Sequence, residues 1–219
     1  MKKMDRKIIN WFGLTGLAAL ISYTAAVIIS PRMYLVYNWM AQAVIDLSAE
    51  SAPLRLFWSK ISAVYDICSV VCATCVSVYA AERRLSLRLF RAAIHLLTVM
   101  NWVSGVGYKM FPLSDSGKEV ASFQEIMHIF VTVMVVLLSI ASLATLIIVG
   151  CRRAEVRSIG IWAATALGMM IGFNGTGAVP PQYFGIVERF SVFAAVGFNA
   201  VPGVALFKGF PSAESEELY

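Results

Sequence analysis

The stretch that decides the fold covers residues 123–150 and reads FQEIMHIFVTVMVVLLSIASLATLIIVG. After Glu125 it contains no acidic residue, lysine or arginine. A helix that crosses the hydrocarbon core of a bilayer needs about 20 mostly apolar residues, and this stretch exceeds that length. It therefore predicts a transmembrane helix.

Similar apolar runs recur on both sides of this stretch, and prolines at 31, 112, 180 and 181 mark breaks between them. The predicted spans are approximately 8–30, 54–81, 89–111, 123–150, 158–177 and 184–207. They predict an all-α fold with one domain, a bundle of six transmembrane helices, followed by a short acidic tail at 209–219.

The composition excludes several other classes of protein. Hydrophobic residues make up 59% of the 219 residues, charged residues 14%, and the mean hydropathy is +0.74. Soluble domains carry about 25% charged residues, so an ordinary cytosolic enzyme is excluded. The net charge of +5 comes from basic clusters between apolar runs, which is typical of membrane flanks. We therefore expect a lipid bilayer, and no nucleic acid, as a partner.

The distribution of lysine and arginine predicts the orientation, because these residues are retained on the cytoplasmic side. With the N-terminus inside, the inner segments carry twelve of the 18 basic residues, which are Lys2, Lys3, Arg6, Lys7, Arg83, Arg84, Arg88, Arg91, Arg152, Arg153, Arg157 and Lys208. The outer segments carry the other six, which are Arg32, Arg55, Lys60, Lys109, Lys118 and Arg189. Both termini are therefore predicted to be cytoplasmic.

Asp66 is the strongest functional candidate. It lies near the middle of the second predicted span, where an ionisable side chain is costly unless it faces protein or water. Ser59, Ser62, Ser69 and Ser77 recur with it at helical spacing and form one polar stripe. The stripe indicates either a functional cavity or a hydrogen-bonded contact between helices, and the sequence leaves both open.

Glu125 and His128 begin the fourth span with the Glu-x-x-His spacing of carboxylate-bridged metal bundles. A metal centre of that type needs further carboxylates, which the chain does not supply in a matching pattern. We therefore expect no metal and no cofactor, and Glu125 could equally be an interfacial anchor. His95 lies toward the opposite side of the membrane and is expected outside the site.

Further polar residues fall on the outer half of the third and sixth spans. Asn101 lies on the third, and Glu188 and Arg189 begin the sixth. Adjacent helical residues point in different directions, so only one of the last two is expected to face inward. The sequence predicts a cavity, open to the outer side, that is lined by Asp66, Asn101, His128 and one of Glu188 or Arg189.

The segment 33–48 between the first two spans is apolar and rich in aromatic residues. A segment of this kind is a candidate for an interfacial helix on the outer surface.

Four short motifs together resemble a known family. They are LSAESAP at 47–53, Gly105-x-Gly107 followed by Phe111-Pro112 and Asp115, His128 at the start of its span, and GIVERF at 185–190. In these motifs the chain resembles the bacterial six-helix integral membrane proteins catalogued as the domain of unknown function 998 family. The resemblance implies a bacterial inner-membrane protein without a settled activity. It also adds weight to residues on the outer side: Phe111, Pro112, Asp115, His128, Glu188 and Arg189.

Three functions are compatible with these features. The favoured one is binding or transport of a small or amphipathic molecule in a polar pocket open to the extracytoplasmic side. The second is an accessory or assembly subunit without chemistry of its own. The third is a membrane-embedded lipid hydrolase that uses Asp66 and His128, although such enzymes usually contain more than the two histidines present here. Whether the protein is an enzyme therefore stays open.

Overall fold

A computed structural model describes residues 7–34, 36–49, 52–82, 88–113, 122–174 and 179–210. The described residues form helices and connecting turns, with no strand among them, which confirms the predicted all-α fold. Most of the predicted acidic tail, from residue 211 onward, lies outside the described residues, as does Asp115 of the family motifs.

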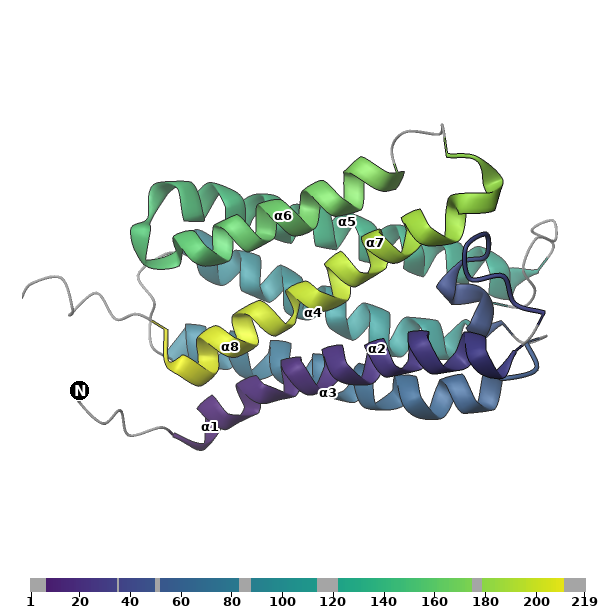
Figure 1. The fold of residues 1–219 in the computed structure, drawn as a ribbon. Coiled ribbons are helices and arrows are strands. Elements are labelled where there is room, and N and C mark those ends of the chain that lie inside the picture. The colour runs from purple at the N-terminus through teal and green to yellow at the C-terminus, as the bar shows by residue number, and fades with distance from the viewer. Residues whose placement is uncertain are drawn as a thin grey trace, which may run out of the picture.

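The helices of the described chain have the following bounds: α1 Ile8–Trp11, η1 Phe12–Leu14, α2 Thr15–Met33, η2 Val44–Ser48, α3 Arg55–Glu82, α4 Arg88–Met110, α5 Phe123–Arg152, η3 Ala154–Val156, α6 Arg157–Asn174, η4 Pro181–Tyr183, α7 Phe184–Phe198 and α8 Ala200–Lys208. Elements α1, η1 and α2 follow one another as a single rod, and so do α7 and α8 (Figure 1). The rods agree with the six predicted spans to within a few residues.

Five stretches are long and apolar enough to cross a membrane: Ile8–Met33, Arg55–Glu82, Arg88–Met110, Phe123–Arg152 and Pro181–Lys208. The remaining rod, α6, has 18 residues, which corresponds to about 27 Å at 1.5 Å per residue. That length is close to the hydrocarbon thickness of about 30 Å. The chain is therefore a multi-pass membrane protein.

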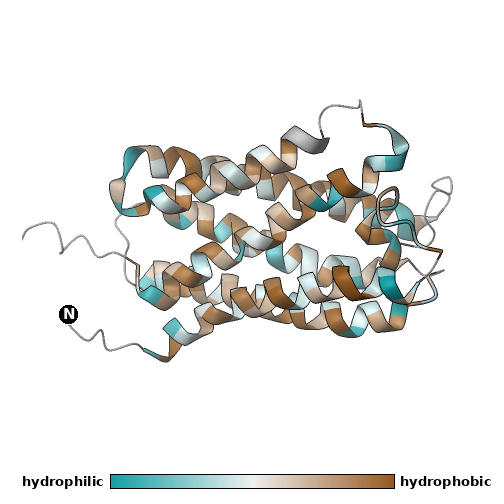
Figure 2. Cartoon of the chain, viewed as in Figure 1, coloured by the Kyte–Doolittle hydropathy of each residue, from teal (hydrophilic) through white to brown (hydrophobic). Residues whose placement is uncertain are grey.

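The rods form a closed ring in which each packs on the next in chain order, and the last rod returns to the first through α8 and α2. The last turn of α2 lies at one end of the bundle (Figure 1), which we call the Tyr34 end after the C-cap residue of that helix. The start of α1 and the end of α8 lie at the other, which we call the Lys7 end after the N-cap residue of α1. Hydrophobic residues cover the length of the rods (Figure 2). Large apolar side chains on the outside, such as Ile21 and Phe130, are 68% and 55% exposed and face the position of lipid.

Close helix contacts at the Lys7 end depend on small residues, as is common between transmembrane helices. A Cβ added at Gly150 of α5 would lie 2.6 Å from Gly160 Cα of α6. Gly13 of η1 meets the backbone of Gly203 of α8 in the same way. These contacts bring the rods close together in the half of the bundle toward the Lys7 end.

The last rod is interrupted at Asn199, between α7 and α8. Pro202 lies in the first turn of α8 and has no N–H to donate to the carbonyl of Phe198, so the helical hydrogen bonding breaks here.

The described residues of 33–48 do not form the interfacial helix for which this segment was a candidate. Beyond Met33 they form turns and the short η2 helix. Val44 and Leu47 are 2% and 1% exposed, because they pack on Trp58 and Tyr23 inside the bundle. The apolar character of this segment therefore reflects burial against protein, not contact with lipid.

Candidate functional site

The half of the bundle toward the Tyr34 end contains a cavity of about 700 Å³. Residues of α2, η2, α3, α4, α5, α6 and α7 line it. It extends from Ser48 and Leu113 at the Tyr34 end to Ser139 and Asn199 near the middle. Ser139 lies about 24 Å along α5 from its first residue, so the cavity reaches roughly halfway through the protein. The charged groups of the cavity lie nearer the Tyr34 end, and the wall of the cavity near the middle of the bundle is mostly apolar.

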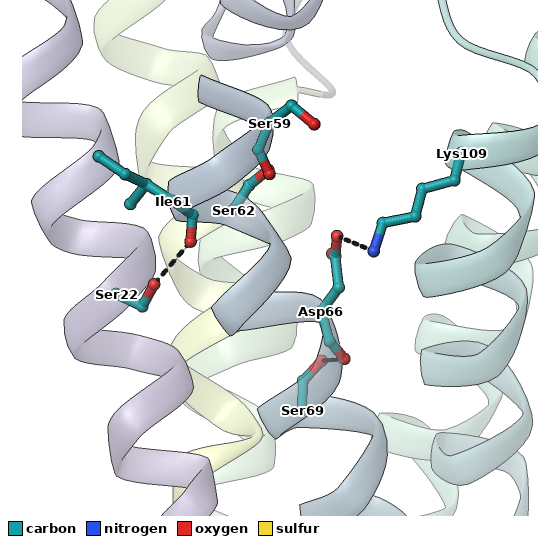
Figure 3. Close-up of polar contacts among 7 residues, drawn as sticks. All are labelled: Ser22, Ser59, Ile61, Ser62, Asp66, Ser69 and Lys109. Carbon is teal, nitrogen blue, oxygen red and sulfur yellow. Dashed lines mark hydrogen bonds and ion pairs between the residues drawn. The ribbon is translucent and has the colours of Figure 1, made fainter. Parts of the chain in front are cut away.

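Asp66 faces this cavity and forms an ion pair with Lys109. The Asp66 Oδ2 lies 3.1 Å from Lys109 Nζ, and the two side chains are 20% and 53% exposed (Figure 3). Lys109 reaches Asp66 from the end of α4, the next helix in the ring. From the sequence, Lys109 was counted only among the basic residues of the outer segments, and this pairing was not predicted. The signal was available, because an antiparallel α3–α4 hairpin places the two residues within about five residues of the same depth.

The polar stripe of α3 divides into two parts. Ser59 and Ser62 line the cavity with Asp66. Further along, Ser69 Oγ donates to the carbonyl of Asp66 at 3.1 Å (Figure 3), and Ser77 Oγ lies 2.5 Å from His95 Nδ1 on α4. The stripe therefore serves both a cavity and a contact between helices, the two alternatives that the sequence left open.

His128 is 7% exposed and lies on the cavity wall. Its Nδ1 lies 2.8 Å from the carbonyl oxygen of Phe111. A carbonyl only accepts, so Nδ1 carries a hydrogen and donates it. The Tyr108 ring, 5.3 Å away between centroids, packs beside the imidazole and also lines the cavity.

Glu125 is not on the cavity wall, contrary to its prediction as a pocket residue. Its carboxylate accepts a hydrogen bond from the N–H of Ser122 at 3.0 Å, and Ser122 Oγ accepts from the N–H of Glu125 at 3.2 Å. This reciprocal pair is a capping box that begins α5. Among the described residues no group of three potential metal ligands comes together. Glu125 thus belongs to the start of α5, for which the Ser-x-x-Glu pattern from Ser122 was the available signal.

Asn101 also lies behind the wall and not on it. It is 2% exposed and pairs with Asn199, which is itself one of the residues that line the cavity. Only Asn101 of this pair was a candidate from the sequence, because Asn199 lies in the mostly apolar run that follows Ser191.

Glu188 and Arg189 both hold residues 37–44, which we call the strap. Glu188 faces the cavity, and its Oε2 accepts from the N–H of Val44 at 3.1 Å. Arg189 faces away from the cavity. Its Nη1 donates to the carbonyls of Trp39, Gln42 and Gly185 at 2.6, 3.1 and 2.7 Å, and its Nη2 donates to Tyr37 Oη at 2.8 Å. Only Glu188 of this pair is therefore a pocket residue.

Tyr37 joins the strap to itself as well as to Arg189. Its hydroxyl donates to the carbonyl of Ala43 at 2.6 Å. Burial raises the pKa of the Tyr37 phenol, and the charge and hydrogen bond of Arg189 oppose part of that increase. The neutral phenol is therefore the form that the folded strap favours.

The structure thus brings Asp66, His128 and Glu188 to one cavity and leaves Asn101, Glu125 and Arg189 outside it. Comparisons of the chain with protein-family models, with curated proteins and with solved structures find no match. The resemblance to the domain of unknown function 998 family consequently remains a prediction from short motifs.

Proposed function

We propose that this multi-pass membrane protein binds, and in the membrane transfers, a small amphipathic molecule through its cavity. The observation that carries the proposal is the cavity itself. Its volume of about 700 Å³ falls within the usual range for ligand pockets, which is about 300–1,000 Å³. Polar groups near the Tyr34 end and an apolar wall deeper inside suit a molecule with a polar head and an apolar body.

Several wall residues favour this use. Asp66, Lys109 and His128 offer charge and hydrogen bonds to a head group. Met100 and Val135 form part of the deeper apolar wall. Polar groups inside a membrane protein cost several kcal/mol each when they have no partner, so water or a ligand is needed beside those that face the cavity.

The test compares two tryptophan substitutions in protein reconstituted into lipid nanodiscs. Ala195 lines the cavity, whereas Ala164 is exposed on the outside of α6. Ala195→Trp is expected to abolish retention of small molecules from a membrane extract, measured by native mass spectrometry. Ala164→Trp is expected to leave retention unchanged. If neither the unmodified protein nor either variant retains a molecule, the accessory-subunit alternative takes precedence over the binding function.

We further propose that the Lys7 end faces the cytoplasm of a bacterial cell and that the cavity opens to the extracytoplasmic side of its inner membrane. The excess of basic residues in segments at the Lys7 end supports this orientation. Cys151, an exposed thiol at that end, provides a native probe. A membrane-impermeant maleimide is expected to label Cys151 only after the cells are permeabilised. Labelling in intact cells would show that the opposite orientation is correct.

A further inference from the structure

Glu188 is a carboxylate of the cavity wall without a cationic partner of its own. In the described part of the chain it accepts one hydrogen bond, from the N–H of Val44 at 3.1 Å. No lysine or arginine among the described residues lies within ion-pair distance of it. The adjacent Arg189 directs its donors to Tyr37, Trp39 and Gln42 of the strap and to Gly185, and none of them to Glu188. The carboxylate therefore meets the cavity without a direct ion pair.

The other charged groups of the wall are already engaged. Asp66 is paired with Lys109 at 3.1 Å, and this pair has no net charge. Arg55, at the first residue of α3, has an interaction of its own. Among the described residues of the wall, Glu188 is therefore a carboxylate without an ion pair of its own. A carboxylate inside a membrane protein is costly unless a counter-charge or a proton reaches it.

An aromatic wall lies beside this carboxylate. Tyr23, Trp58 and Tyr65 all line the cavity, and the Tyr23 ring centroid lies 6.0 Å from that of Trp58 and 5.1 Å from that of Tyr65. Val44, which donates to Glu188, packs in the same buried cluster as Tyr23 and Trp58. The faces of aromatic rings attract cations, and tryptophan attracts them most strongly.

Resting on the proposed function, we propose that the bound molecule is an amphiphilic organic cation, an alkyl amine or quaternary ammonium compound. Its charged head lies between the Glu188 carboxylate and the rings of Tyr23, Trp58 and Tyr65. Its apolar part extends toward the deeper wall around Met100. The carboxylate supplies the counter-charge, and the rings exclude water while still favouring a positive head.

The test uses three probes with the same twelve-carbon chain, applied to the whole protein in nanodiscs. They are dodecyltrimethylammonium, the uncharged dodecyldimethylphosphine oxide and the anionic laurate. We expect the cation to bind about ten-fold more tightly than the uncharged probe, after subtraction of binding to empty nanodiscs. Glu188→Gln keeps an acceptor for Val44 and is expected to remove this preference while the affinity for the uncharged probe changes less than about two-fold.

A second pair of variants keeps the test decisive if Glu188→Gln does not fold. Tyr65→Leu removes a ring and is expected to weaken binding of the cation about five-fold, whereas Tyr65→Phe keeps the ring and leaves that affinity unchanged. Equal binding of cation and uncharged probe, or a preference for laurate, would overturn the proposed ligand class but leave the pocket in place. Absence of binding by all three probes would overturn the pocket function as well.

Discussion

Asn101 and Asn199 exchange two hydrogen bonds between the middle of α4 and the break between α7 and α8. Asn101 Nδ2 donates to Asn199 Oδ1 at 3.1 Å, and Asn199 Nδ2 donates to Asn101 Oδ1 at 3.0 Å. The side chains are 2% and 3% exposed, and Asn199 forms the floor of the cavity. The pair therefore fixes the position of the helix break against the opposite side of the ring.

The two members of this pair are expected to be energetically coupled. Asn101→Leu leaves the Asn199 amide buried without its partner, and we expect a loss of about 1–2 kcal/mol in the free energy of unfolding. The double variant Asn101→Leu/Asn199→Leu is expected to lose less than the sum of the two single variants. Equilibrium unfolding in mixed micelles measures all three. Strict additivity would show that the two amides are not coupled.

The interaction energy between Asp66 and Lys109 is expected to be smaller than that between Asn101 and Asn199. Lys109→Met leaves Asp66 without its cation, and we expect a loss of about 1 kcal/mol or less, because the lysine side chain is 53% exposed and solvent screens the pair. Adding Asp66→Asn to Lys109→Met is expected to restore part of that loss. Thermal unfolding in detergent is the measurement, and Lys60→Met, which removes an exposed lysine of the same end, is the matched control.

We predict that Arg189 holds the strap in its folded conformation. Arg189→Met removes donors to the carbonyls of Trp39 and Gln42 and to the hydroxyl of Tyr37. We expect hydrogen exchange of peptides that cover the strap to become at least about ten-fold faster, while α5 remains protected. Arg189→Lys is expected to restore little protection, since a single ammonium cannot reproduce the planar fork. Unchanged exchange in Arg189→Met would show that apolar packing alone holds the strap.

The raised pKa of Tyr37 predicts a loss of strap order at high pH. A group whose pKa is higher in the folded state stabilises it fully below the unfolded pKa of about 10, and this stabilisation is lost as pH rises through the folded pKa. Hydrogen exchange in the strap is therefore expected to show no contribution from Tyr37 ionisation at pH 7–9 and to increase above about pH 10 beyond the intrinsic base-catalysed rate. Tyr37→Phe should lack this excess increase. An equal increase in both proteins would assign it to another group.

The contact between Gly150 and Gly160 predicts that alanine destabilises the protein at Gly160 of α6 but not at Gly168 of the same helix. Gly160→Ala places a methyl group 2.7 Å from Gly150 Cα, and we expect a loss of about 1–3 kcal/mol in the free energy of unfolding. At Gly168 an added Cβ meets nothing within 4 Å, so Gly168→Ala is expected to be neutral or stabilising by up to about 1 kcal/mol. The same unfolding assay compares them, and equal effects would contradict the close α5–α6 packing.

The sequence was informative where a physical constraint acts on local residues. Apolar length predicted the rods, and the cost of a charge in the membrane predicted that Asp66 faces protein or a cavity. Contacts between distant segments were not predictable in the same way. Lys109 and Asn199 come from other parts of the chain than their partners, and the strap that Arg189 binds carries no distinctive polar pattern that would have indicated the contact. Glu125 was predicted as a pocket residue from its spacing to His128, whereas its partner in the structure is Ser122, three residues earlier, in the capping box that begins α5.

The tight meeting of Gly13 and Gly203 has a consequence for ion leakage. Buried apolar side chains such as Leu146 and Leu206 belong to the packed core on the Lys7 side of Asn199. Because a charge is costly among apolar groups, we expect this packed layer to exclude ions, so that the cavity would not dissipate an ion gradient. A side chain larger than hydrogen at position 13 or 203 is expected to push the α1–α2 rod away from α8 and to weaken that exclusion.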